Sequence, residues 1–469
     1  MSFLLPKSIS ISETSLNRTT HQLRQARKLN RQVAGTVTLL LSMVVTATPA
    51  LSADARSIAL GGSAIANGKG AYGAVENPAS LMAMKRRGER FHFQIGFSAQ
   101  VRDSGNLFDT FDDEDNQNLI TDIESEIESL EQTQVSCDPV FGSSDDVCVT
   151  GTAELGNLSE RLLDILDAVN DETLDAQITA DFGGARTQGN YPFAVNLRIQ
   201  ATGAGTQSVA DGDRVYVEEF ETVLSDNELT LGEAADSSFL QVSALGIPLG
   251  IVQPEDVLTS DGQASAVLRT QLGISFATTI KVGNVIADVG ITPKFSSLVA
   301  RSVEASIENQ LLDDTESLNN QFDDSEVTES SFTFDVGGSV QLSQLPLRLA
   351  AVLRNAAPES VSTLSGFEFE TTPQLIVGAL YRLNNLSVNA DIALNEAEVD
   401  NFTTQMAALG LEYGLSFLSL RAGISHDASR PDNATAFSIG AGLGPLNIGG
   451  RLGNNSDSLE LGAQLSFSF

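Results

Sequence analysis

Residues Leu459–Phe469, LELGAQLSFSF, alternate strictly between apolar and polar or small side chains. The apolar set is Leu459, Leu461, Ala463, Leu465, Phe467 and Phe469, and the set between them is Glu460, Gly462, Gln464, Ser466 and Ser468. A period of two places each set on its own face of a β-strand. This stretch predicts a strand with one apolar and one polar face.

The same alternation recurs from Tyr191 onward, in residues 332–341, 386–395, 418–425 and 437–443. Segments of about ten residues have the length of a tilted strand that crosses a membrane. A closed barrel leaves no unpaired backbone group facing lipid, and Tyr381, Tyr413 and Phe417 near strand ends suit an interfacial girdle. We predict an all-β fold, a transmembrane antiparallel β-barrel. A soluble β-sandwich is the alternative, but the Gly-, Ser- and Asn-rich polar face favours a filled lumen.

A different kind of segment precedes the strands, ARSIALGGSAIANGKGAYGAVENPASLM at Ala55–Met82. It is rich in Gly and Ala and has no sustained period, and Asn77-Pro78 indicates a turn. Such a coil suits the inside of an enclosing structure. A phosphate-binding loop is excluded, because five residues instead of four separate Gly62 from Gly68 and Gly70 follows Lys69.

This segment resembles the N-terminal part of the outer-membrane long-chain fatty-acid transporter superfamily and, within it, the TraF-like conjugal-transfer barrels. The resemblance rests on Gly61-Gly62 and on Asn77, Pro78 and Ala79, which match the Asn-Pro-Ala plug motif. It implies a barrel of about 14 strands whose lumen is plugged by the N-terminal segment. We therefore expect a plug at 54–90 and a barrel at 91–469. The terminal aromatic Phe469 also resembles the last strand of bacterial outer-membrane barrels.

Residues 1–53 have the features of a secretory signal peptide. Six basic residues precede a largely apolar run from Val33 to Ala47, and small residues at 49–53 offer a cleavage site. A membrane anchor is the alternative, but the run is short for a spanning helix of ~20 residues. We expect the outer membrane of a Gram-negative bacterium as the location. The expected partners are outer-membrane lipid, lipopolysaccharide and the barrel-assembly machinery.

The chain is strongly acidic, with a net charge of −34. Residues 1–53 contribute six basic residues and one acid, so the remainder carries −34 − 5 = −39. Such a surface repels phosphate backbones. We expect no direct binding of nucleic acid.

Two cysteines, Cys137 and Cys148, lie in a loop-like stretch. In an exported protein the natural interpretation is a disulfide. A metal pair is the alternative, but further ligands are scarce, because His92 and His426 are the only histidines after residue 53. Asp113, Asp115 and Glu124 match three positions of a calcium loop that lacks its central Gly. An ordinary acidic loop fits them better, and we predict no metal.

Residues 102–186 are predicted to form a long acidic insertion outside the membrane, with a helix between Leu155 and Ile178. Two further interruptions are expected within the barrel. Residues 211–226 suggest an acidic strand and turn, and Leu298–Asn320 suggests a loop with helical character that follows a strand at Val285–Phe295.

No catalytic motif is present, since G-x-S-x-G is missing and His426-Asp427 with Ser429 does not make a triad by sequence proximity. A barrel hydrolase is the minor alternative; we predict no enzyme and no cofactor. The resemblance implies passive transport of a hydrophobic small molecule through a plugged barrel. The alternative is a non-transporting accessory barrel of a conjugal-transfer or envelope machine, and the acidic loops weigh against capture of an anionic lipid.

Overall fold

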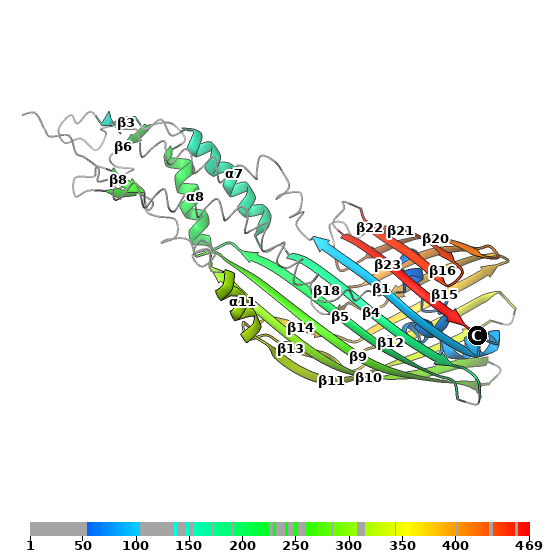
Figure 1. The fold of residues 1–469 in the computed structure, drawn as a ribbon. Helices are drawn as coiled ribbons and strands as arrows, with labels where there is room; N and C mark the ends of the chain where they lie inside the picture. The colour runs from blue at the N-terminus through cyan, green and yellow to red at the C-terminus, as the bar shows by residue number, and fades with distance from the viewer. Residues whose placement is uncertain are drawn as a thin grey trace, which may run out of the picture.

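In the computed structural model, the described residues are 54–103, 136–137, 147–149, 153–170, 173–189, 191–224, 228–230, 240–242, 248–251, 259–283, 285–306, 315–342, 344–399, 402–430, 435–454 and 458–469. Within these ranges fourteen strands close into one antiparallel barrel (Figure 1). In chain order they are β1 Phe91–Asp103, β4 Thr173–Arg186, β5 Phe193–Ser208, β9 Asp261–Val282, β10 Val285–Ser306, β11 Val327–Gln341, β12 Leu347–Arg354, β15 Gln374–Leu383, β16 Leu386–Ala393, β19 Met406–Gly414, β20 Leu418–Asp427, β21 Thr435–Leu443, β22 Leu446–Gly453 and β23 Ser458–Ser468. The barrel prediction and its strand number are confirmed.

The ring is closed by the first and last strands. β1 pairs with β4 on one side and with β23 on the other, where Phe93 lies opposite Phe467. Phe469 extends this seam by one residue, because its N–H donates to the carbonyl of Phe91 at 2.9 Å and its carbonyl accepts from Phe91 and Arg90. The C-terminal aromatic residue thus lies at the point where the barrel closes.

The two faces of the strands are inverted relative to a soluble protein. On β23, Leu461 is 55% exposed on the outside, whereas Glu460 and Gln464 are buried on the inside. On β20, Leu420 faces outward and Arg421 is buried. A soluble β-sandwich would bury the apolar set, so this arrangement rules out that alternative for the barrel. No helix in the described ranges combines the length and apolar character needed to cross a bilayer.

The ends of the barrel differ. At the end that holds the C-terminus, strands are joined by short turns at 187–192, 283–284, 342–346, 384–385, 415–417 and 444–445. At the opposite, long-loop end lie the extended connections, among them α7 Ala153–Val169, α8 Asp211–Leu224 and α11 Thr315–Asp324. Helices α7 and α8 lie side by side beyond the strands (Figure 1) and are joined by an ion pair of Arg214 with Asp167 at 2.9 Å. Short strands also occur there, β2 Ser136–Cys137, β3 Val147–Val149, β6 Glu228–Thr230, β7 Leu240–Val242 and β8 Pro248–Ile251.

A separate four-stranded sheet caps the inside at this end. It is formed by β13 Glu359–Ser362, β14 Glu368–Thr371, β17 Ala397–Val399 and β18 Phe402–Thr404. Val361 and Phe369 of its first hairpin pack against Val267 of β9 and Leu298 of β10. The hairpin therefore covers an apolar part of the inner wall.

The expected boundaries of the insertion need correction. Arg102 and Asp103 belong to β1, and 173–186 form β4, so the connection between these strands is 104–172. Leu174 and Ile178 have helical spacing with α7, but they pair with Asp103 and Ala99 of β1. The backbone pairing of the barrel overrides the local helical pattern.

Two other local expectations were wrong. Residues 211–224 form helix α8 instead of a strand and turn, and β10 continues through Leu298 to Ser306 instead of ending at Phe295. The pairing of β10 with β9 explains its length, because register partners run from Val285 to Ser306.

The cysteine prediction is tested only in part by the backbone. Cys137 of β2 lies directly opposite Cys148 of β3 in an antiparallel pair, and opposed residues of such a pair have Cα separations within the range that a disulfide spans. Their side chains lie outside the described part, so the disulfide stays a prediction. Residues 1–53 and the residues of the calcium-loop pattern, Asp113, Asp115 and Glu124, also lie outside it.

Candidate functional site: the plugged lumen

The plug segment, residues 54–88, lies inside the barrel as three short helices, α2 Ala55–Ala59, α3 Gly70–Glu76 and α4 Ser80–Arg87. The Asp54 carboxylate caps α2 by accepting a hydrogen bond from the N–H of Arg56 at 3.1 Å. Gly88 ends α4 in the left-handed conformation, at φ 80°. Local capping thus supports the start of α2 and the end of α4, whereas α3 has no side-chain cap.

A buried ion cluster fixes the first part of the plug to the wall. The guanidinium of Arg56 donates to both carboxylate oxygens of Glu412 on β19, at 3.1 and 2.7 Å. Arg421 of β20 donates to the same carboxylate at 3.2 Å, and Lys69 approaches it at 3.3 Å. Burial disfavours the charged form of Arg56, but Glu412 outweighs burial and raises the pKa of Arg56. The plug is therefore held in place by an interaction that is costly to break.

A second carboxylate binds the plug backbone. Asp391 of β16 accepts hydrogen bonds from the N–H groups of Ala64 and Ile65, at 2.6 and 2.9 Å. These residues lie between α2 and α3, where no helix satisfies their donors. The wall therefore supplies the acceptor that buried backbone requires.

Asn77, the central residue of the predicted motif, links three places. Its side-chain amide donates to the carbonyls of Ile65 in the plug and Gly338 in β11, both at 3.3 Å, and its Oδ1 accepts from Ala79 at 3.0 Å. Its partner in the wall is a backbone carbonyl. Asn77 is thus both a turn residue and a tie to the wall.

The wall opposite Asn77-Pro78 has two glycines, without side chains, on neighbouring strands. Gly290 of β10 and Gly337 of β11 are register partners. A Cβ on Gly337 would clash with Oδ1 of Asn77 and lie 2.8 Å from Pro78, and a Cβ on Gly290 would lie 2.7 Å from Pro78. The two glycines therefore allow the plug turn to touch the strand backbone.

Gly61 and Gly62, the other predicted plug residues, make the turn that follows α2. Both have positive φ, 73° and 97°, which L-residues with side chains rarely adopt. A Cβ on Gly61 would lie 2.7 Å from the carbonyl oxygen of Ile424 in β20. Gly61 is needed for both conformation and close approach, whereas Gly62 is exposed.

The α3 side of the plug is bound by β1 and by the strands next to it. His92 accepts the N–H of Ala71 at 3.1 Å through Nδ1, and Gln94 accepts the N–H of Tyr72 at 3.2 Å. Arg198 donates to the hydroxyl of Tyr72 at 2.9 Å while it is paired with Asp181. Polar contacts therefore hold the plug on opposite sides of the lumen.

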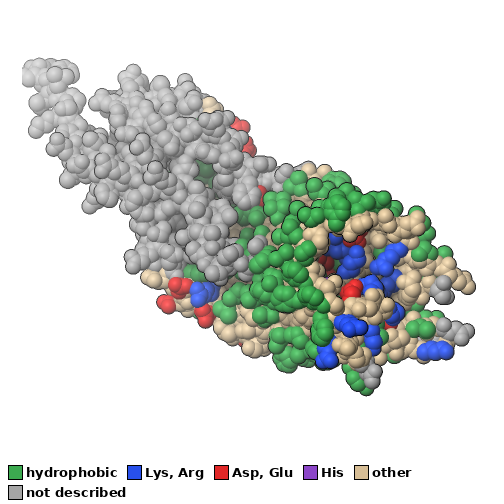
Figure 2. Space-filling model, turned by 45° about the vertical axis from the view of Figure 1, so that its right-hand side comes forward, with side chains coloured by type: hydrophobic (Ala, Val, Ile, Leu, Met, Phe, Trp, Pro, Cys, Tyr) green, Lys and Arg blue, Asp and Glu red, His purple; other side chains and the backbone are tan. Residues whose placement is uncertain are grey.

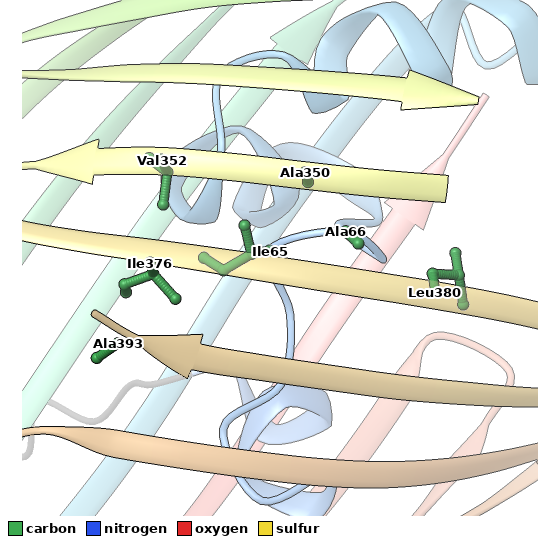
Figure 3. Close-up of a cluster of buried hydrophobic side chains, with 7 residues drawn as sticks. All are labelled: Ile65, Ala66, Ala350, Val352, Ile376, Leu380 and Ala393. Carbon is green, nitrogen blue, oxygen red and sulfur yellow. The ribbon is translucent and has the colours of Figure 1, made fainter. Parts of the chain in front are cut away.

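An apolar seam runs between these contacts. Ile65 and Ala66 of the plug pack against Val352 of β12 and Ile376 of β15 (Figure 3), which face each other in the strand register. Ala350, Leu380 and Ala393 complete the seam. This cluster is an apolar contact between the plug and the inner wall.

The sequence identified the motif residues but missed Arg56 with Glu412 and the acceptor Asp391. Glu412 and Asp391 were detectable as inward-facing charges in alternating strands, but their partners lie more than 300 residues away in the chain. Nothing in a strand pattern specifies such a partner.

No curated protein matches the chain. Among solved structures, the Pseudomonas putida toluene transporter TodX is 12% identical, with 89% of this chain and 99% of that chain covered and a TM-score of 0.43. The TodX deltaS2S3 mutant monoaromatic hydrocarbon channel is 12% identical, with the same coverage and a TM-score of 0.42. A mutant porin of Rh. blastica is 14% identical, with 80% and 99% covered and a TM-score of 0.25.

The sequence also matches a protein-family model, described as F plasmid transfer operon, TraF, protein, over residues 74–392. That range includes Asn77, Pro78 and Ala79 and extends through β16. The family description names a plasmid transfer operon. Since the match spans more than half of the chain, the protein belongs to the TraF family of the F plasmid transfer operon.

Proposed function

We propose that this protein is an outer-membrane channel that passes a small apolar molecule, with the plug segment as its gate. Its exposed outer wall of Leu, Ile and Phe suits lipid, and buried polar residues line the lumen. Outer-membrane lipid and lipopolysaccharide would contact that wall, and the barrel-assembly machinery would insert it. Fractionation with the outer membrane and heat-modifiable migration on gels test this location, and recovery as a soluble protein would refute it.

The observation that supports passage of an apolar molecule is the seam between the plug and the wall. Ile65 and Ala66 offer an apolar surface against β12 and β15. A second apolar surface, at Val267 and Leu298 beneath the β13–β14 hairpin, lies toward the long-loop end. A small shift of the plug along the seam would expose apolar surface without unpairing a strand.

The test locks the plug to the wall. A Cβ on Gly183 of β4 would lie 3.1 Å from the Cβ of Ala71 in α3. It would have no other non-neighbouring atom of the described residues within 4 Å. A small adjustment gives the Cβ separation of a disulfide. The variant Ala71→Cys with Gly183→Cys, in a Cys137→Ser and Cys148→Ser background, is compared with each single cysteine variant.

The readout is uptake of labelled oleate and of toluene by cells that lack their own channels for these compounds. We expect slow uptake in the oxidised double variant, recovery with reductant, and normal uptake in the single variants. If cells that contain the unlocked protein take up no more of either compound than cells without it, the channel function is refuted. Equal uptake with the plug locked would refute its role as a gate.

The second candidate function is an accessory barrel of a conjugal-transfer machine. Two observations favour it: the family description, and a lumen closed by buried ion pairs such as Arg56 with Glu412. Loss of plasmid transfer on deletion of the gene, together with rescue by the locked variant, would support this function against the channel.

A further inference from the structure

Basic side chains gather at the short-turn end of the barrel, although the whole chain carries −34 (Figure 2). Six of them are exposed. Arg186 at the end of β4 lies over the outward-facing ring of Phe91, and the other five are Arg86 and Arg87 of α4, Arg90 before β1, Lys281 of β9 and Arg382 of β15. We call these five the basic mouth. It comes from three separate parts of the chain that the barrel brings to one opening.

The acids near the basic mouth do not balance it. Asp288 is occupied by both guanidinium nitrogens of Arg86, and Glu89 pairs with Arg87 at 2.6 Å. Among the described residues, no acidic side chain forms an ion pair with Arg90, Lys281 or Arg382. Positive charge is therefore left over at this surface.

Buried charge beneath the mouth adds to this excess. Arg348 of β12 is 7% exposed, and its Nε has no hydrogen-bond partner among the described residues. Its guanidinium experiences the positive charges of Arg86, Arg87 and Arg382 together with the negative charge of Asp288, which is 3.9 Å away. Clustered like charges raise the free energy of the unbound protein, and an opposite charge at the opening relieves this.

The surroundings of the mouth leave it free of competing charge. The short turns at 187–192, 283–284, 342–346, 384–385, 415–417 and 444–445 contain no Asp, Glu, Lys or Arg. The acids are concentrated at the other end, where 104–172 contain a single basic residue, Arg161. Charge is thus distributed unevenly along the barrel axis, and the positive end is the one with the short turns.

The direction of the side chains distinguishes lipid from a protein partner. Leu380 and His92 are buried inside the barrel, whereas Phe91 is exposed outside. Arg382 is two residues from Leu380 and Arg90 is two residues from His92, so both arginines lie on the inward-facing side of the chain. These charges therefore surround the opening of the lumen, whereas lipid headgroups would contact the outer rim. A bilayer does not cover the opening.

We propose that the basic mouth is a docking surface for an acidic segment of a protein that lies beneath the short-turn end. Charge complementarity selects the partner: several carboxylates in a row match positive charges spread over α4, β9 and β15. Binding is expected to weaken as salt rises, because the pairs are exposed to solvent. The inference does not depend on what passes through the barrel.

The experiment uses the full chain in nanodiscs of uncharged lipid and a fluorescein-labelled ten-residue polyglutamate peptide as probe. Fluorescence anisotropy measures binding at low and high salt, with a polyglutamine peptide as the neutral control. The variant Arg90→Gln with Arg382→Gln is compared with Arg214→Gln and Arg301→Gln, which removes the same charge at the long-loop end. Heat-modifiable migration shows that each variant is folded.

We expect polyglutamate to bind, the mouth variant to bind on the order of tenfold more weakly, and the control variant to match the wild type. Equal binding by both variants, or equal binding of polyglutamine, would overturn the proposal. Full displacement of the peptide by inorganic phosphate at constant ionic strength would identify a small-anion site instead. Loss of peptide binding in discs with phosphatidylglycerol would identify lipid as the occupant, and either result would refute an acidic protein segment.

Discussion

Arg56 and Glu412 join the plug to the barrel through two hydrogen bonds, of 3.1 and 2.7 Å, and both side chains are about 5% exposed. The carboxylate has three basic neighbours, because Arg421 and Lys69 also contact it. Glu412 is thus the centre of the cluster and Arg56 is one of its arms.

Glu412→Gln should loosen the plug more than Arg56→Met does. The first change leaves Arg56 and Arg421 buried without their counter-charge, which costs about 3–5 kcal/mol for a broken buried pair. The second leaves Glu412 paired with Arg421. Hydrogen exchange of the α2 amides measures both variants, with heat-modifiable migration as the check on the barrel. Equal exchange in the two variants would contradict this role for the carboxylate.

Lys69→Met should not loosen the plug at pH 7. The positive charge of Arg56 lowers the pKa of Lys69 to about 8. A lowered pKa means that the folded protein binds this proton less tightly than the unfolded chain does, so the charge opposes folding below pH 8 and the effect fades as pH rises toward 10.5. Exchange of the same α2 amides is the measurement. Faster exchange in Lys69→Met would show that the contact with Glu412 outweighs the repulsion.

Asn77→Ala should release the plug turn while the barrel stays closed. Three hydrogen bonds are lost, and the carbonyls of Ile65 and Gly338 lose a donor, at a cost of about 1–3 kcal/mol. Limited proteolysis of residues 54–84 measures the result, with Asn385→Ala in an exposed turn as the control. Unchanged protection would leave Asn77-Pro78 as a turn only.

Local pattern predicted the strands well, because inside and outside alternate along each one. The alternation at 459–469 specifies its faces without reference to any other strand. Asn77-Pro78 was equally readable as a turn, since its signal comes from adjacent residues. Both features depend on chain geometry within a few residues.

Features that depend on distant partners were not predictable. Arg56 and Glu412 are 356 residues apart, and alternation gives the face of Glu412 but not what meets it there. Residues 211–226 suggested an acidic strand and turn, yet 211–224 form α8. Tyr216 and Val217 are both buried in it, and α8 packs against α7, a neighbour that the sequence does not specify.

Cys137 and Cys148 should form a disulfide in the purified protein. Their backbones are opposed in β2 and β3, and closing so short a ring stabilises the folded chain by about 2–3 kcal/mol in the chain-entropy model. Thiol labelling of native protein without reductant should find none reactive, and labelling after reduction should find two. Two reactive thiols before reduction would refute the bond.

Gly337→Ala should unseat the plug turn, and Gly338→Ala should not. A Cβ on Gly337 would clash with the side-chain Oδ1 of Asn77 and lie 2.8 Å from Pro78, whereas the nearest atom to a Cβ on Gly338 is the carbonyl oxygen of Asp288, 3.8 Å away. The residues are adjacent on β11, so their strand propensity and pairing are matched, and only a Cβ on Gly337 would point at the plug. Proteolysis of residues 54–84 should therefore accelerate in Gly337→Ala alone, with both proteins heat-modifiable. Equal protection from proteolysis in the two variants would mean that β11 shifts to accommodate the added methyl group. Close packing of Asn77-Pro78 against β11 would then not be what holds the plug.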